Sequence, residues 1–304
     1  MIRGALALAV LTVATSASAV PPAPVIAPRQ GLRSIVAIAG PPSAAVVIGK
    51  TGETYEPDGK GAWIRRADGS IAGDVVAATR AGDVAVAEVA HAPPFERLHG
   101  GGWSVMNVGL HANALLGRGP RPTAAVGKAI FALEPGKATK LADAPAPVLA
   151  VAASAKTLVA ETERGLARWE GAKWTPLAKA PHHVAVLLDP KWATVERGVV
   201  DLDTGKVTAW PAGFHPLVAT SVGDAIYAAS ERELVTVEHG AASKDALPAL
   251  ASPVVAITAE RGGRVLVATR AGQLAQRIAG TWTTTELRDA PFTPHDGPPP
   301  AESR

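Results

Sequence analysis

Cysteine is absent from all 304 residues of this chain. A disulfide framework and a lipid-modified cysteine are therefore excluded. The chain also lacks any apolar run near the roughly 20 residues that a membrane-spanning helix needs, so we expect no membrane span. A strong charge of one sign is missing too: the formal net charge is +3. That value gives no reason to expect nucleic acid as a partner.

The first nineteen residues have the three-part form of a secretory signal peptide. Arg3 precedes the apolar run 4–14, and Ala17 and Ala19 mark a cleavage site before Val20. We therefore expect an exported bacterial protein, periplasmic or extracellular. The chain then divides into the signal peptide (1–19), a Pro-rich segment (20–33), a folded region (34–288) and a disordered Pro-rich tail (289–304).

Glycine recurs along the folded region with steps of 34 to 42 residues. The seven positions are Gly59, Gly101, Gly136, Gly171, Gly205, Gly240 and Gly280. Four tryptophans follow in the same phase, namely Trp63, Trp103, Trp174 and Trp282. A period in the thirties without long helical stretches indicates a solenoid or a propeller.

The clearest repeat unit covers 253–287 and reads as four short strands, which we call a to d. Strands a and b are almost continuously apolar in most units. In a sheet with one face exposed to solvent, apolar and polar residues would alternate along each strand. Both faces of each sheet must therefore be covered, as neighbouring blades cover them in a propeller. The sequence predicts an all-β fold, a single β-propeller of seven four-stranded blades. Six blades and an open solenoid are the alternatives.

The recurring residues have structural interpretations in this fold. Each glycine should supply the positive φ of the hairpin between strands c and d, and each tryptophan should pack between blades. The stretch 162–177, TERGLARWEGAKWTPL, resembles the bacterial two-component-regulator-type propeller repeats, which carry a small-Gly-Leu step followed by a Gly-x-x-Trp strand. That resemblance implies a sensor or binding propeller, with no fixed ligand and no catalytic set.

Three fragments are similar to functional motifs, but each lacks an essential part. Residues 48–51 are similar to the end of a phosphate loop, yet a strand is expected after them where that motif is followed by a helix. Residues 99–102 are similar to an esterase oxyanion loop, but the sequence contains no Gly-x-Ser-x-Gly nucleophile elbow. A calcium loop is imitated by 201–205 without its remaining oxygen ligands, so a plain turn is the preferred interpretation. No metal and no cofactor are predicted.

One constellation remains, because a propeller brings all b–c turns and all d–a connections to the same face. At the end of strand b, six units carry a cation, namely Lys50, Lys128, Arg164, Arg197, Arg232 and Arg270. Histidines stand at the start of strand a in three units, namely His111, His182, His183 and His215. Together they predict an electropositive rim around the central opening, although charged residues in turns are often only solvated tips.

These features predict a monomeric, non-catalytic binding scaffold or sensor whose partner is a protein or an anionic glycan. The alternative is a propeller enzyme of the lactonase, lyase or glycosidase type that uses histidines and acids of the axial loops. The acids that keep this alternative open are Asp74, Glu161, Glu163, Glu196 and Glu231. Nothing in their spacing singles out a pair, so no catalytic residue is assigned.

Overall fold

A computed structural model describes residues 34–68, 74–81, 84–90, 95–99, 102–106, 110, 114–118, 122–134 and 137–291. The predicted signal peptide, the segment 20–33 and the tail from 292 onward lie outside these residues. The described helices are two short 3-10 turns, η1 (Pro42–Ala44) and η2 (Leu287–Asp289). Within the described residues, no helix is long and apolar enough to cross a membrane.

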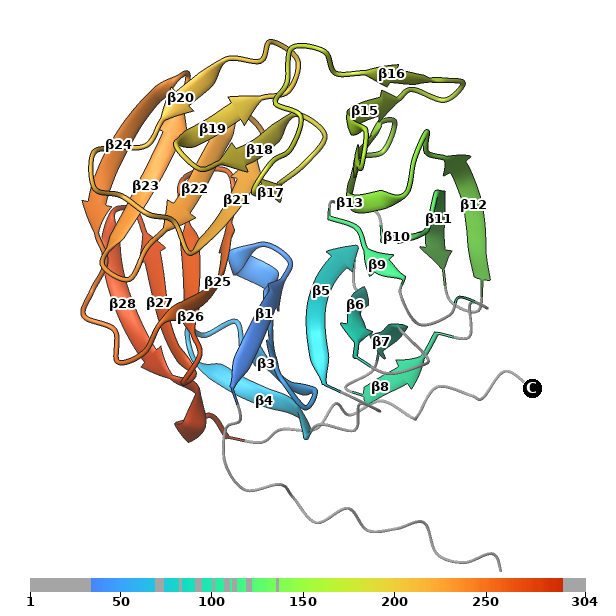
Figure 1. Cartoon of the computed structure of the whole chain (residues 1–304). Helices are drawn as coiled ribbons and strands as arrows, with labels where there is room; N and C mark the ends of the chain where they lie inside the picture. Colours follow the sequence, from blue (N-terminus) through green and yellow to red (C-terminus); the bar gives the residue numbers. More distant parts are fainter. Residues whose placement is uncertain are drawn as a thin grey trace, which may run out of the picture.

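The described strands form seven four-stranded antiparallel sheets arranged around a central axis (Figure 1). In each sheet the strands follow chain order from the innermost strand a to the outermost strand d. The predicted all-β propeller is therefore confirmed. The first three sheets contain β1 (Ile35–Ala39), β2 (Val46–Gly49), β3 (Glu53–Pro57), β4 (Trp63–Asp68); β5 (Val75–Ala81), β6 (Val84–Val89), β7 (Phe95–His99), β8 (Gly102–Val105); β9 (Leu115–Leu116), β10 (Thr123–Val126), β11 (Ala129–Glu134) and β12 (Lys137–Asp143).

The remaining sheets follow in the same order around the axis. They contain β13 (Val148–Ala153), β14 (Leu158–Thr162), β15 (Gly165–Trp169), β16 (Trp174–Pro176); β17 (Val186–Leu187), β18 (Trp192–Val195), β19 (Gly198–Asp201), β20 (Val207–Ala209); β21 (Val218–Val222), β22 (Ala225–Ala229), β23 (Glu233–Glu238), β24 (Ala241–Ala246); β25 (Val254–Ala259), β26 (Val265–Thr269), β27 (Gln273–Ile278) and β28 (Thr281–Glu286).

The hydrophobic core is divided into clusters, each lying between two neighbouring sheets. One cluster joins Val46 and Ile48 of the first sheet to Ala85 and Ala87 of the second. Similar clusters occupy the other interfaces, including the one between the last sheet and the first. Strands a and b contact a neighbour on both faces, which explains their continuously apolar sequences.

The recurring tryptophans pack between sheets, as predicted from their spacing. Trp63, Trp103, Trp174 and Trp282 each contact a cluster shared by their own sheet and the preceding one. Trp103 also donates a buried hydrogen bond from Nε1 to the carbonyl oxygen of Gly52 at 2.7 Å. The indole thus contributes both apolar contact and a polar link between two sheets.

The recurring glycines adopt positive φ in the hairpins between strands c and d. Five of them have φ between 73° and 85°, namely Gly59, Gly171, Gly205, Gly240 and Gly280. The prediction is confirmed for these five; Gly101 and Gly136 lie outside the described residues. At Gly205 an added Cβ would also meet the carbonyl oxygen of Lys179, so this turn has no room for a side chain.

The first and last sheets meet without exchanging a strand. Ile35 N donates to the carbonyl oxygen of Arg270 at 2.9 Å. Ser43 Oγ donates to Glu260 Oε2 at 2.6 Å, also across this interface. The chain after η2 continues beside the outer strand β4, where Arg65 N donates to the carbonyl oxygen of Pro291 at 3.0 Å. Backbone hydrogen bonds and one shared hydrophobic cluster therefore close the ring.

Candidate functional site

The b–c turns and the d–a connections lie on one face of the ring, which we call the d–a face. Hydrogen bonds between neighbouring sheets tie these segments together: Val75 N donates to the carbonyl oxygen of Lys50, and Val148 N to that of Gly127, both at 2.8 Å. Within single sheets, strand d ends at the same turn, since Trp210 N donates to the carbonyl oxygen of Arg197 at 2.9 Å. The turn backbone is therefore fixed, while its side chains remain available.

The six predicted cations occupy equivalent b–c turns on this face, and we call them the cationic rim. All six side chains are exposed. Lys50 forms an ion pair with Asp74 at 3.0 Å. The other five form no ion pair with a described residue. Carboxylates at Glu163, Glu196 and Glu231 precede three rim arginines in the chain, so the rim is mixed in charge.

The structure brings two of the predicted histidines together with a buried acid. His182 and His183 lie in the β16–β17 connection with ring centroids 4.4 Å apart in an edge-on arrangement. His183 Nδ1 lies 3.2 Å from Oε1 of Glu161, whose side chain is buried on β14. His215 is exposed in the β20–β21 connection, away from this pair in sequence. His111 lies outside the described residues.

The Glu161 carboxylate has a structural role that sequence analysis missed. Its Oε1 also accepts a hydrogen bond from Val184 N at 3.3 Å, just before the short inner strand β17. Glu88 holds the equivalent register on β6 and accepts one from Leu116 N of the short strand β9 at 2.8 Å. Both acids thus anchor an inner strand that has few ladder bonds. Among the described residues, no three His, Asp or Glu side chains are grouped to hold a metal.

Small residues of the inner strands line a central cavity of about 620 Å³. Arg118, after β9, and Asp189 add charge to its lining. The Arg118 side chain has solvent access, but the surrounding protein desolvates the guanidinium and lowers its pKa. A parallel bridge to Ala152 places Arg118 near the far end of β13, toward the face opposite the cationic rim.

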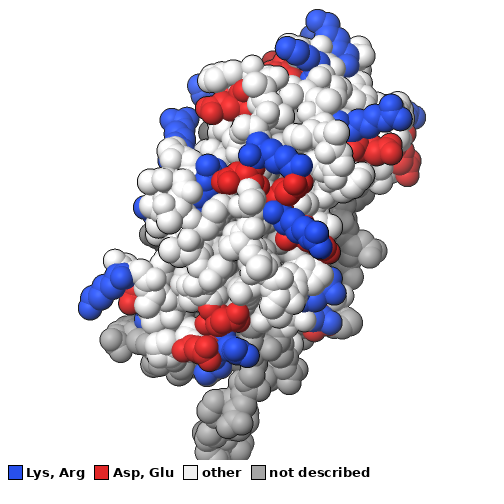
Figure 2. All heavy atoms as spheres, turned by 90° about the vertical axis from the view of Figure 1, so that its left-hand side faces the viewer, with Lys and Arg blue, Asp and Glu red and all other residues white. Residues whose placement is uncertain are grey.

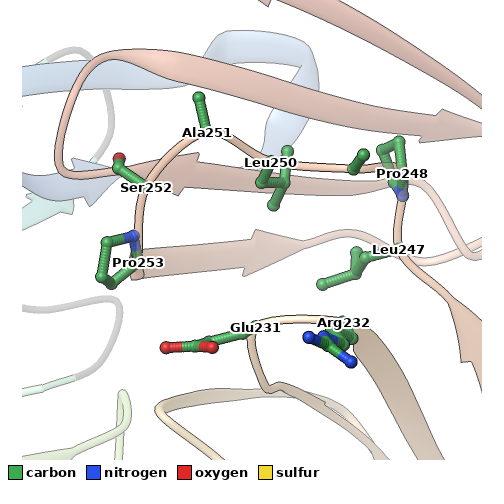
Figure 3. Close-up of a pocket in the computed structure, with 9 residues that line it drawn as sticks. Glu231, Arg232, Leu247, Pro248, Leu250, Ala251, Ser252 and Pro253 are labelled. Carbon is green, nitrogen blue, oxygen red and sulfur yellow. The ribbon is translucent and has the colours of Figure 1, made fainter.

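A groove of about 550 Å³ lies beside the rim, between the turn after β22 and the β24–β25 connection. Glu231 and Arg232 form one wall, and Leu247, Leu250 and Pro253 lie across from them (Figure 3). One rim cation therefore faces an apolar loop of the next sheet as well as solvent.

The fragment that is similar to a calcium loop forms a turn, as predicted. Asp201 Oδ1 accepts hydrogen bonds from the backbone N–H groups of Asp203 and Thr204, both at 2.9 Å. Asp203 forms an ion pair with Arg168 of the preceding sheet. These two carboxylates have partners within the protein, in the connection between β19 and β20.

Comparisons with known proteins identify the fold and leave the family open. No protein-family model and no curated protein sequence matches the chain. Among solved structures, the designed protein Ika8 shares 14% identity over 88% of this chain and 91% of its own, with a TM-score of 0.57. The WD40 β-propeller domain of Doa1 shares 13% over 86% and 96%, with a TM-score of 0.56. YCF48 from Cyanidioschyzon merolae shares 17% over 86% and 97%, with a TM-score of 0.51.

Proposed function

We propose that this protein is an exported, non-catalytic binding scaffold whose d–a face holds an anionic partner, either a protein segment or an acidic glycan. The observation that carries the proposal is the cationic rim. One exposed cation stands at the same turn in six repeat units, and five of the six have no ion pair with a described residue. The backbone of these turns already joins the sheets, so the fold gives no reason for the repeated charge.

Some cations elsewhere on the surface are paired with acids. Figure 2 shows the side wall of the ring, where Lys and Arg lie beside Asp and Glu. Lys244 contacts Glu233 at 2.6 Å on this outer region, and Arg264 contacts Glu260 at 3.3 Å. Such exposed pairs contribute little stability, but they neutralise the local field. On the rim only Lys50 has such a partner among the described residues, and the other five cations remain unpaired, which favours association with an anion.

Propeller architecture is compatible with a protein partner. A structure of YCF48 bound to D1 peptide shares 15% identity with this chain, covering 82% of it and 94% of that protein, with a TM-score of 0.52. The similarity concerns the fold, and the choice of ligand here rests on the charges of the rim.

The test compares two triple charge reversals on immobilised heparin. One carries Arg164→Glu, Arg232→Glu and Arg270→Glu on the rim. The matched control carries Lys60→Glu, Lys156→Glu and Arg261→Glu, exposed cations in the a–b and c–d turns of the opposite face. Both variants have the same net charge, so they differ only in where the charge lies.

We expect the rim variant to elute at clearly lower salt than the control. The wild type should also lose retention as salt rises, because the Debye length at 0.15 M is only about 8 Å. Equal elution of the two variants would reduce the rim to solvated turn tips and contradict the proposal.

A further inference from the structure

Four sheets repeat the same β-bulge at the second residue of strand a. The register between strands a and b skips Val36, Val76, Leu149 and Val255. A bulge removes a residue from the regular ladder and redirects its side chain. Three of these residues line the central cavity, as does Leu217 just before β21. We call these five residues the apolar collar.

Three collar side chains are unusually exposed for their type. Val76, Leu149 and Leu217 have exposed fractions of 54%, 49% and 51%, and they are three of the six strongly exposed large apolar residues described. None of the three belongs to the hydrophobic clusters between sheets. They contribute little to the core, so their side chains are available for contact with a partner at the inner strands of the ring.

The collar lies inside the cationic rim, at the same mouth of the cavity. Ile35 precedes the bulged Val36 and donates its N–H to the carbonyl oxygen of Arg270. Val75 precedes the bulged Val76 and donates in the same way to Lys50. Each of these collar residues is therefore one position from a residue bonded to a rim turn. An apolar centre surrounded by cations is complementary to an apolar group flanked by carboxylates.

We propose that the apolar collar receives a large apolar side chain of a protein partner, whose flanking Asp or Glu residues contact the cationic rim. This inference rests on the proposed function and narrows the anionic partner to an acidic protein segment. An acidic glycan would satisfy the rim but would leave the collar exposed to water, because it carries no large apolar side chain. Apolar contact and charge together favour the protein.

The test selects a displayed library of random twelve-residue peptides on three proteins. These are the wild type, a collar variant (V76S, L149S and L217S) and a matched control (V105S, V207S and I278S). The control truncates exposed apolar residues on the outer parts of the ring, with exposed fractions of 47%, 46% and 45%. Enriched peptides are then measured by fluorescence anisotropy against all three proteins.

We expect the wild type and the control to enrich peptides with a large apolar residue between Asp or Glu residues. The collar variant should bind the same peptides about tenfold more weakly or worse. Its serines no longer provide an apolar surface on which the large side chain of the peptide is buried. Circular dichroism and thermal unfolding establish that the variants are folded.

Other outcomes overturn the inference in distinguishable ways. If the enriched peptides are acidic but contain no large apolar residue, the rim alone is the binding site. The same conclusion follows if the collar variant binds the enriched peptides as tightly as the wild type does. A dimer of the wild type that the collar variant abolishes would assign the collar to a second copy of this chain. Heparin binding through the rim without enrichment of any peptide would favour a glycan partner.

Discussion

Glu88 shows how a single half-buried acid can compensate for a short strand. Strand β9 comprises two residues, so few ladder bonds hold it to β10. The carboxylate of Glu88 supplies an acceptor to Leu116 N from the neighbouring sheet. Desolvation by burial raises its pKa above the ordinary 4.5, and the hydrogen bond from Leu116 only partly opposes this change. The contact therefore comes with an electrostatic cost at neutral pH.

Because of this cost, we expect Glu88→Gln to change how the free energy of unfolding depends on pH. The pKa of Glu88 is higher in the folded state than in the unfolded state. Between these two pKa values, the folded state therefore binds more protons than the unfolded state. The free energy of unfolding should then decrease as pH rises through the window above 4.5. Glutamine keeps an acceptor for Leu116 N but does not titrate. We expect the variant to be at least as stable as the wild type at pH 7, with a flatter profile, measured by urea unfolding between pH 4 and 8.

Two comparison variants separate charge from hydrogen bonding at this position. Glu88→Ala leaves the Leu116 N–H without an acceptor and should cost about 1–3 kcal/mol. Glu134→Gln removes an exposed acid on β11 and serves as the control for loss of a negative charge. A wild-type stability that rises with pH through this window would contradict the assigned direction.

At the scale of the element, two hairpins place a non-glycine residue in the left-handed region. His239 and Ala279 have φ of 50° and 49°, and each precedes a glycine that also has positive φ. Two consecutive positive φ values define a type I′ turn, in which Asn-Gly is strongly preferred. Alanine gains no local hydrogen bond there and bears the steric cost of its Cβ.

The β27–β28 hairpin should therefore be stabilised by Ala279→Asn. Ala279 is exposed, so no packing contact is lost. Relief of the left-handed strain should add about 1 kcal/mol, measured as a shift in the urea midpoint. Ala279→Val, which adds a β-branched side chain at positive φ, should shift the midpoint in the other direction. Opposite or equal shifts would contradict the turn assignment.

Sequence periodicity predicts the elements that recur in every unit. The hairpin glycines repeat in seven units and the tryptophans in four, in the same phase, because these units share the same turn geometry and the same packing between sheets. The bulges at Val36 and Val76 were missed because a bulged valine and a ladder valine look alike in an apolar strand. A signal existed: four units begin strand a with Ile or Val, then Val or Leu, then Ala. The contacts of Glu88 and Glu161 depend on two neighbouring units, which a single-unit pattern does not contain.

At the scale of the whole molecule, both the fold and the proposed site depend on closure of the ring. The cluster at the closing interface combines Ile35 and Tyr55 from the first sheet with Leu266 and Leu274 from the last. The collar and the rim each gather residues from both ends of the chain, since Val36 and Lys50 belong to the first sheet and Arg270 to the last. Loss of closure would therefore remove the binding surface together with the stabilising contacts.

Deletion of residues 253–287 tests this dependence. The deletion removes β25–β28 and exposes the apolar faces that the last sheet covers on the first sheet and on the β21–β24 sheet. It also leaves strand edges without partners, which promotes aggregation. We expect the shortened protein to be insoluble or to lose cooperative thermal unfolding, while a chain ending at residue 291 keeps every described contact and serves as the control. A soluble, monomeric deletion variant that unfolds cooperatively would show that each sheet depends only on its nearest neighbours, as in a solenoid, and that closure is dispensable for folding.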